Sequence, residues 1–259
     1  MPELPVGLIT ALLPFIAVGF FAQLIDGALG MAFGVITNTL LVGVLGLAPA
    51  RASAGVHLVE VFTTGASAIS HVMHRNVNWR LFSRLVIPGS IGGVTGAYLL
   101  VNFDADVSRP FVMGYLACLG LYLLWRGWQM NRHSTHRSAT IVEPLALVGG
   151  FLDAAGGGGW GPIVTSNLLV QGTEPRTTIG TVNTAEFFLT TVISLAFIAA
   201  MGFAAFGVAV TGLIIGGLLA APLGAIVAKR IPAKLLLLLV GTVLTATSLF
   251  SLYRAIGWQ

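Results

Sequence analysis

Residues 25–41 read IDGALGMAFGVITNTLL, and residues 152–168 read LDAAGGGGWGPIVTSNL. When the two stretches are aligned, Asp26 faces Asp153, and each stretch carries several glycines inside an apolar segment. Glycine weakens a helix interior and leaves its peptide groups accessible, so neither stretch is typical of a regular helix facing lipid. The pair predicts two broken helices in related halves of one chain.

The likeness continues downstream of both stretches after a slip of one residue. Pro49 then aligns with Pro175, and VHLVEVFTT, which contains Glu60, aligns with VNTAEFFLT, which contains Glu186. Apolar membrane sequences match one another easily, so paired Val or Leu positions carry little weight. Acidic residues are a stricter test, because only four of the nine lie in or beside apolar segments and the alignment pairs all four. The pattern predicts a duplicated unit.

Composition places the chain in a membrane. Of its 259 residues 56% are hydrophobic and 8% are charged, whereas soluble domains carry about 25% charged residues. The net charge is +4, but the basic residues lie in short loops rather than on one face, which argues against a nucleic-acid partner. The single cysteine, Cys118, can form neither a disulfide nor a cysteine metal site within one chain. We expect no cofactor and no metal.

A membrane-spanning helix needs about 20 mostly apolar residues, and this criterion predicts ten segments. They are 6–25, 29–47, 52–73, 79–101, 108–128, 141–155, 158–172, 177–200, 203–228 and 233–254. Two of them, 29–47 and 158–172, are short or interrupted by glycine, so they can be broken or re-entrant helices. We count them as crossing, because the basic cluster at 229–234 would otherwise lie outside. The predicted fold is an all-α polytopic bundle. It consists of a first repeat (1–130), a basic cytoplasmic linker (131–140) and a second repeat (141–259).

The distribution of charge predicts the orientation of the segments. Lys and Arg accumulate in cytoplasmic loops, and the basic clusters lie at 74–84, 126–137 and 229–234. If all ten segments cross, these clusters share one side, and the loop with Asp104 and Asp106 lies on the other side with both termini. Five segments in each half then give the halves opposite orientations. This is the inverted repeat of many secondary transporters.

Polar side chains recur at helical spacing in the third segment and in its counterpart. They are Ser53, His57, Glu60, Thr64, Ser67 and His71 in the third, and Asn183, Glu186, Thr190 and Ser194 in the eighth. Steps of three or four residues place each set on one helix face, which is expected to point into the bundle rather than at lipid. Each half is therefore predicted to contribute one polar face to a shared cavity.

Glu60 and Glu186 are the candidates for proton coupling. An ionised carboxylate inside a membrane is unfavourable by several kcal/mol unless it is solvated or paired, so such a group is suited to binding and releasing protons. His57 lies three residues before Glu60 and can share a proton with it. Each of these residues can instead serve only to bond a neighbouring helix. The duplication favours function for the two glutamates, and both interpretations stay open for His57.

The broken stretches are the candidate substrate site, because backbone N–H groups at a helix N-terminus bind anions without a formal positive charge. The residues expected to contribute are Gly30, Gly34, Thr37, Asn38, Thr39, Gly157, Gly158, Gly161, Thr165, Ser166, Asn167 and Asn183. Glycines can also serve close helix packing alone, but the run at 156–159 exceeds what packing requires. The expected ligand is a small oxyanion.

Gating or structural roles are expected for three further pairs. They are Asp26 with Asp153, Pro49 with Pro175, and Arg51 with Arg176. The two arginines follow the paired prolines near segment ends, where they either attract anions or extend to lipid headgroups. We favour the headgroup interpretation.

Several of these stretches together resemble the TauE/SafE family of sulfite exporters over nearly the whole chain. They are DGALGMAFG, PARASAGVHLVEVFTT, VNWRLFSRLVIPGSIGGVTGAYL, LDAAGGGGWGPIVTSNLL and VNTAEFF. The resemblance implies export of sulfite, or of an organosulfonate such as sulfoacetate, across the cytoplasmic membrane of a bacterium. The implied partners are this small anion, protons and membrane lipid, and the sequence leaves a homo-oligomer open.

Other classes of function are weighed against this one. A passive anion channel can be lined by the same glycines and polar faces. An intramembrane enzyme is less favoured, because the sequence has no nucleophile elbow, no HExxH motif and no Cys/His ligand spacing. Cation transport through the four acidic residues is a third alternative. A GxxxxGK[ST] loop for ATP is absent as well, so an ion gradient is the expected energy source.

Overall fold

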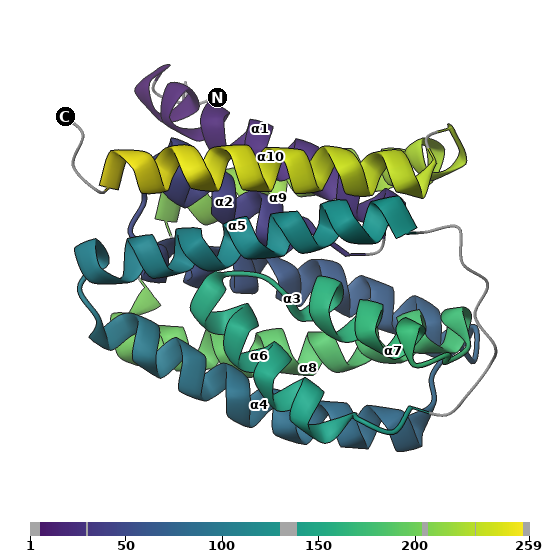
Figure 1. Cartoon of the computed structure of the whole chain (residues 1–259). Coiled ribbons are helices and arrows are strands. Elements are labelled where there is room, and N and C mark those ends of the chain that lie inside the picture. Colours follow the sequence, from purple (N-terminus) through teal and green to yellow (C-terminus); the bar gives the residue numbers. More distant parts are fainter. Residues whose placement is uncertain (1–5, 30, 130–138, 204–206, 231, 256–259) are drawn as a thin grey trace.

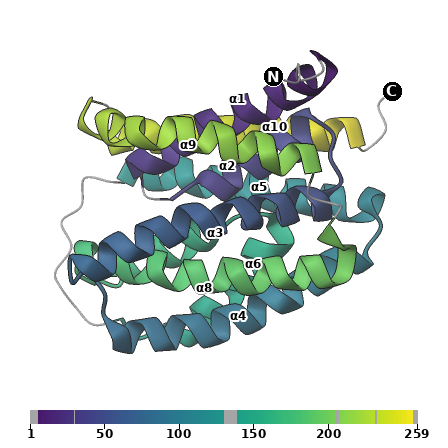
Figure 2. The same ribbon diagram turned by 180° about the vertical axis from the view of Figure 1, so that it is seen from behind.

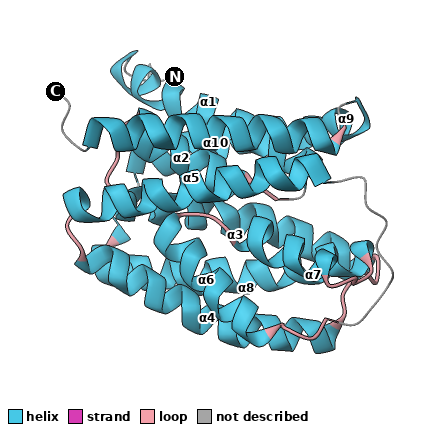
Figure 3. Ribbon diagram, in the orientation of Figure 1, coloured by secondary structure: helices cyan, strands magenta, loops and turns pink. Residues whose placement is uncertain are grey.

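The chain folds as a bundle of helices (Figure 1). The computed structural model describes residues 6–29, 31–129, 139–203, 207–230 and 232–255. In these residues ten α-helices and two π-helices are joined by short loops, without a strand (Figure 3). The predicted all-α fold is confirmed. Most of the predicted linker lies outside the described residues.

The two halves contain similar successions of elements, except that the π-helix follows the short α-helix in the first half and precedes it in the second. The first has α1 (Val6–Leu29), α2 (Phe33–Thr39), the π-helix η1 (Leu40–Val44), α3 (Pro49–Met73), α4 (Trp79–Asn102) and α5 (Ala105–Gln129). The second has α6 (Glu143–Gly156), the π-helix η2 (Trp160–Thr165), α7 (Ser166–Val170), α8 (Pro175–Met201), α9 (Gly207–Arg230) and α10 (Ala233–Ala255). Among the described helices α4, α5, α8 and α10 are long and apolar enough to cross a membrane. The interrupted elements are the two short segments predicted from glycine.

The paired prolines occupy equivalent positions at helix starts. Pro49 is the first residue of α3 and Pro175 is the first residue of α8, where the missing N–H costs nothing. At α8 the Glu174 carboxylate also accepts the N–H groups of Arg176 (3.0 Å) and Thr177 (2.7 Å). The structural role predicted for the prolines is to begin the two long central helices.

The short segment of the second half is the returning arm of a hairpin. We define hairpin 2 as α6, η2 and α7. Its two ends are joined by Gln171, whose Oε1 accepts the N–H groups of Thr140 (2.9 Å) and Ile141 (3.0 Å). The returning arm has six residues in η2 and five in α7, which reach about 17 Å against a hydrocarbon core of about 30 Å. Hairpin 2 therefore begins and ends at one end of the bundle.

Hairpin 1, which we define as α1, α2 and η1, opens at the opposite end. Arg109 near the start of α5 donates to the carbonyls of Val42 (2.9 Å), Gly46 (3.0 Å) and Leu47 (3.2 Å), and so holds the end of η1 there. Figures 1 and 2 show the start of α1 and the end of α10 at this end, away from the loops of hairpin 2. The short segments thus return instead of crossing alone. A segment that returns leaves the number of crossings even, so the predicted sidedness of the loops stays a consistent prediction.

Each helix of one half packs on a helix of the other half. The main pairs are α1 with α9, α4 with α6, α3 with α8 and α5 with α10. Glycine permits the closest approaches, since a Cβ at Gly92 would meet the Leu147 carbonyl and a Cβ at Gly216 would meet the Ile16 carbonyl. The first two pairs run parallel and the last two antiparallel (Figures 1 and 2). A two-fold axis in the membrane plane generates this pattern, and we propose that the halves form an inverted repeat.

Charge distinguishes the two ends of the bundle. The end at which hairpin 2 opens and α3 meets α4 carries Arg75, Arg80 and Arg84, and we call it the basic end. There Arg84 pairs with Glu143 at the start of α6, with Nη2 and Oε2 2.9 Å apart. The opposite end holds the turn from α4 to α5 with Asp104, and we call it the acidic end. Because arginine accumulates on the cytoplasmic side, we expect the basic end to face the cytoplasm.

Candidate functional site

The tips of the two hairpins meet at the centre of the bundle. Asn38 of α2 donates through Nδ2 to the carbonyl of Gly156 at the end of α6. A Cβ added at Gly158 would fall on the backbone of Gly34 and Val35, and Gly158 also has φ 145°. Both the close approach and the backbone conformation require glycine at this position. The glycine run therefore lets two interrupted helices touch.

Both tips are closed by the same hydrogen bond. Asp26 Oδ1 accepts the N–H of Phe33 at 3.0 Å, and Asp153 Oδ1 accepts the N–H of Trp160 at 2.9 Å, seven residues downstream in each case. These N–H groups begin interrupted helices and have no partner within them. The two aspartates thus have the same structural role, which is to cap the first N–H group of each interrupted helix. These N–H groups were expected to bind an anion, and part of them is already bonded to the protein's own carboxylates.

A polar cavity of about 320 Å³ leads from the tips toward the basic end. Its lining residues are Gln23, Asp26, Phe33, Glu60, Thr63, Thr64, Ser67, His71, Ile179, Asn183 and Glu186. His71 lies at the mouth, beside the turn that follows α3, where the Asn76 side chain contacts its Nδ1 at 3.4 Å. We call this space the inner cavity. The polar face predicted on α3 lines one of its walls.

A narrower space of about 20 Å³ lies between the tips and extends the inner cavity. The two share Asp26, Phe33, Glu60 and Glu186, and the narrow space adds Asp153 with residues of both tips. All four acidic residues that the alignment pairs therefore border one continuous polar region. The predicted duplication converges on a single site.

The electrostatics of this region are set by carboxyl groups. Among the described residues that line the two spaces there is no lysine or arginine. Glu60 is 5% exposed, and its Oε2 has no hydrogen-bond partner in the described part of the chain. Asp153, Glu186 and Asp26 all repel charge on Glu60. Because like charges interact strongly away from water, the region favours bound protons or a cation.

His57 bonds across the two halves instead of bonding Glu60. The ring is fully buried, with Nδ1 2.7 Å from the Ser53 carbonyl and Nε2 3.1 Å from Asp153 Oδ2. Ser53 Oγ also donates to the Ala154 carbonyl at 2.6 Å, which fastens α3 to α6. The Ser53 carbonyl, one turn earlier on α3, fixes Nδ1 and turns Nε2 toward α6. The sequence suggested Glu60 as the partner of His57, because spacing along the sequence identifies only neighbours on the same helix.

Comparison with known proteins agrees with this architecture. The sequence profile described as Sulfite exporter TauE/SafE matches residues 15–251, which include hairpin 2 and all of hairpin 1 but the first nine residues of α1. The chain belongs to the TauE/SafE family. Probable membrane transporter protein YtnM of Bacillus subtilis (strain 168) is 42% identical over 197 residues, which cover 74% of this chain and 65% of that relative. No solved structure matches. This TauE/SafE protein is a multi-pass protein of the bacterial cytoplasmic membrane.

The remaining residues predicted to bind substrate are divided between cavity and core in this TauE/SafE protein. Asn183 lines the inner cavity and donates to Ser67 Oγ at 3.2 Å. Gly34, Gly158 and Gly161 border the narrow space. The residues that are buried near the tips but do not line either space are Thr37, Asn38, Thr39, Gly157, Thr165 and Ser166. Asn167 bonds the Ile163 carbonyl within its own arm, and Gly30 lies outside the described residues.

Two exposed arginines mark opposite ends of this TauE/SafE protein. Arg51 lies in the first turn of α3 at the acidic end, and Arg176 lies in the first turn of α8 at the basic end. Neither is among the residues that line the two spaces. Their positions suit contact with headgroups, as we favour from the sequence.

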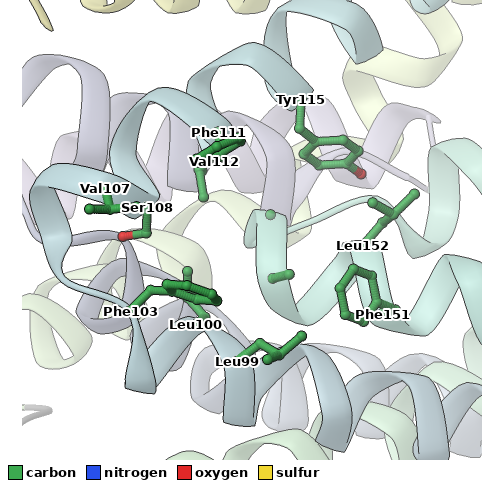
Figure 4. A pocket seen from close by; sticks show the side chains of 12 residues that line it. Leu99, Leu100, Phe103, Val107, Ser108, Phe111, Val112, Tyr115, Phe151 and Leu152 are labelled. Atoms are coloured by element: carbon green, nitrogen blue, oxygen red, sulfur yellow. The ribbon is translucent and has the colours of Figure 1, made fainter.

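A second, larger cavity of this TauE/SafE protein lies between α4, α5 and α6 (Figure 4). It measures about 560 Å³, and side chains such as Leu99, Phe111 and Phe151 give it an apolar lining. Nothing in that lining suits an oxyanion. At its edge Tyr115 donates its hydroxyl to the Gly158 carbonyl (2.9 Å), which supports the tip of hairpin 2. Sequence reasoning missed Tyr115, because no spacing rule connects α5 to that tip.

Toward the acidic end, the path from the central carboxyl groups is closed. The three α3 residues Thr63, Ser67 and His71, which line the inner cavity, align with three α8 residues, Leu189, Ile193 and Phe197. The α8 residues are apolar and fully buried, and the Phe197 ring packs on His57 with their centroids 6.2 Å apart. In the described part of the chain, the inner cavity therefore opens beside His71 at the basic end, and buried apolar side chains lie on the opposite side of the carboxyl groups.

Proposed function

We propose that the protein is a secondary transporter that exports a small sulfur oxyanion across the cytoplasmic membrane, coupled to the proton gradient. Sulfite, or an organosulfonate such as sulfoacetate, is the proposed substrate. The observation that carries the proposal is the inner cavity, whose volume of about 320 Å³ suits a small anion and which opens at the basic end. The description of the family as sulfite exporters supports the choice of anion.

The carboxyl groups dictate how protons and anion are coupled. An anion can enter a space bordered by Asp26, Glu60, Asp153 and Glu186 only when protons neutralise part of their charge. Proton binding and anion binding then reinforce each other, so substrate affinity rises as pH falls. If one proton accompanies a divalent sulfite, net negative charge leaves the cell. A membrane potential that is negative inside favours this by about 2.3 kcal/mol per 100 mV.

Closure toward the acidic end supports a carrier over an open pore. A passive channel needs a continuous polar path, whereas Leu189, Ile193 and Phe197 are fully buried on the far side of the site. The inverted-repeat interpretation supports alternating access, in which the two halves exchange conformations and open the other side. The anion would bind beside Asn183 and the tip backbone around Gly34 and Gly158.

Cation transport is the second candidate, because the same four carboxyl groups favour a positively charged ligand. A proton or a metal cation would be drawn to Glu60, whose Oε2 is buried and has no hydrogen-bond partner in the described residues. In that case the oxyanion would bind poorly at every pH. The two candidates therefore predict opposite responses to added sulfite.

The test is flux in liposomes that contain the purified protein. Sulfite and sulfoacetate are followed with and without an imposed pH gradient, for the native protein and the double variant Glu60→Gln, Glu186→Gln. We expect gradient-driven sulfite accumulation that the double variant loses, while Glu143→Gln at the exposed start of α6 retains it. Flux of sodium or potassium without sulfite or sulfoacetate flux supports the cation candidate. Absence of both anion fluxes under every gradient contradicts the proposed substrate.

A further inference from the structure

The buried contact between His57 and Asp153 has a defined number of protons. His57 Nδ1 lies 2.7 Å from the Ser53 carbonyl oxygen, which can only accept, so Nδ1 carries a hydrogen. Nε2 lies 3.1 Å from Asp153 Oδ2, and a hydrogen bond there needs one more hydrogen. That hydrogen comes either from a protonated carboxyl group or from an imidazolium ring. In both descriptions the pair holds one exchangeable proton.

Loss of this proton is incompatible with the observed contact. A bare imidazole nitrogen and a carboxylate oxygen are both acceptors, and two acceptors 3.1 Å apart without a hydrogen between them repel. Bulk water does not reach the contact to relieve the repulsion, because His57 and Asp153 are 0% and 2% exposed. The proton can therefore leave only if the carboxyl group and the ring separate, which requires α6 to move relative to α3.

The surrounding groups connect the pair to the inner cavity. Asp153 borders the narrow space between the tips together with Glu60 from α3, Glu186 from α8 and Asp26 from α1. Tyr115 from α5 is the other titratable group near Asp153. The carboxyl groups of Glu60 and Glu186 border both the narrow space and the inner cavity, and so offer a route for the proton between the pair and the cavity.

We infer that the His57–Asp153 pair is the proton-carrying site of the transport cycle, a step that rests on the proposed function. It holds one proton between Nε2 and Oδ2 while hairpin 2 is docked on α3. Separation of hairpin 2 from α3 releases the proton. The proton passes from the pair to a neighbouring carboxylate or to water, so no bond other than the N–H or O–H bond is broken. Proton release is thereby linked to the movement that changes access.

The site exists in only one half, and this provides matched controls. The residue that aligns with His57 is Asn183, which binds no proton, and Asp26 closes its tip through Phe33 as Asp153 does through Trp160. An asparagine at position 153 retains an oxygen that can accept the Trp160 N–H. The variants Asp153→Asn and Asp26→Asn therefore both retain the oxygen that accepts the N–H group at the tip. Only Asp153→Asn removes the carboxyl group that shares a proton with His57.

The first experiment reads the pair directly and needs no substrate. The full-length protein in lipid nanodiscs carries isotope-labelled histidine, and the His57 nitrogen signals are identified by their loss in His57→Asn. We expect Asp153→Asn to shift the Nε2 signal and change its response to pH, whereas Asp26→Asn leaves both as in the native protein. An Nε2 signal that Asp153→Asn does not alter, or that both variants alter equally, overturns the proton pair.

The second experiment measures coupling in liposomes loaded with sulfite and a pH-sensitive dye. We expect His57→Asn and Asp153→Asn to keep sulfite counterflow and to lose gradient-driven sulfite accumulation with its accompanying proton movement. The control His74→Asn alters an exposed histidine at the end of α3 and retains both. Gradient-driven accumulation that persists in Asp153→Asn overturns the inference. If the native protein moves no sulfite, the proposed function fails, and the nanodisc experiment still decides on the pair.

Discussion

Hairpins 1 and 2 have related sequences, yet their tips lie in different surroundings. Asp26 at the first tip is partly exposed and borders the inner cavity, whereas Asp153 at the second is 2% exposed and bonds His57. The second tip is also held by the Tyr115 hydroxyl. The tip of hairpin 1 thus lies in an open environment, while the related tip of hairpin 2 is docked on α3. We infer that transport exchanges these environments between the hairpins, as inverted repeats permit.

The backbone is conserved between the tips more closely than the side chains are. Ala32 and Gly159, which immediately precede the two capped N–H groups, have φ values of 142° and 154°. A positive φ costs an L-residue about 1–2 kcal/mol, so Ala32 adopts this conformation against its own preference. The capping bond from the aspartate therefore imposes the shape of both tips. Glycine at the second tip additionally provides room for Tyr115.

The comparison between the two hairpins requires that they open at opposite sides of the membrane. We expect Ala48→Cys, after hairpin 1, to react with a membrane-impermeant maleimide only from the periplasm. Thr140→Cys, before hairpin 2, should react only from the cytoplasm, because the basic end faces inward. Both changes are made in a Cys118→Ser background and measured on intact cells and inverted vesicles. Reaction of both cysteines from one side would rule out opposed hairpins.

Alanine placed at equivalent positions of the two tips tests which hairpin is the more tightly packed. In Gly158→Ala the new Cβ meets the backbone of Gly34 and Val35, and φ is 145°, so we expect a loss of stability on the order of 3 kcal/mol. Met31→Ala, the aligned change at the first tip, removes a half-buried side chain and should cost about 1 kcal/mol. Thermal unfolding in detergent, followed by tryptophan fluorescence, measures both. Equal losses would mean that the tips are equally confined.

The smallest expected effect comes from relieving strain at the first tip. Ala32→Gly allows φ 142° without a Cβ, and we expect a gain of about 0.5–1 kcal/mol after the added flexibility of the unfolded chain is subtracted. The reciprocal Gly159→Ala should lower stability, since its Cβ would overlap the Tyr115 hydroxyl. The same fluorescence measurement compares their unfolding midpoints. A destabilised Ala32→Gly would show that the alanine conformation carries no strain.

Periodic and pairwise features of this fold could be predicted from the sequence. Ten segments follow from apolar length, and the polar face of α3 follows from residues three or four apart such as Glu60, Thr64 and Ser67. The four acidic residues were singled out as duplicated, and they border one space. These features depend on local spacing or on similarity within the chain, and both are visible in one sequence.

Contacts between distant segments could not be predicted in the same way. His57 and Asp153 are 96 residues apart, and only the docking of α6 on α3 brings them together. The glycines raised a return of the short arms only as an alternative to crossing. Arg109 and Gln171, which fix where each arm ends, bond residues far away along the chain. Hydropathy measures whether a segment prefers lipid and carries no information on where it turns back.

The interlocking of the tips also has a consequence for biosynthesis. Asn38 bonds the carbonyl of Gly156, a residue translated 118 positions later. At about 5–20 residues per second the first hairpin waits on the order of ten seconds for its partner, with Asn38 and the polar tip unpaired at membrane depth. Each helix can leave the insertion machinery in turn, but the core closes only after the second hairpin arrives. Closure of the core is therefore a late step of assembly, and until then the polar groups of the first tip lack their partner.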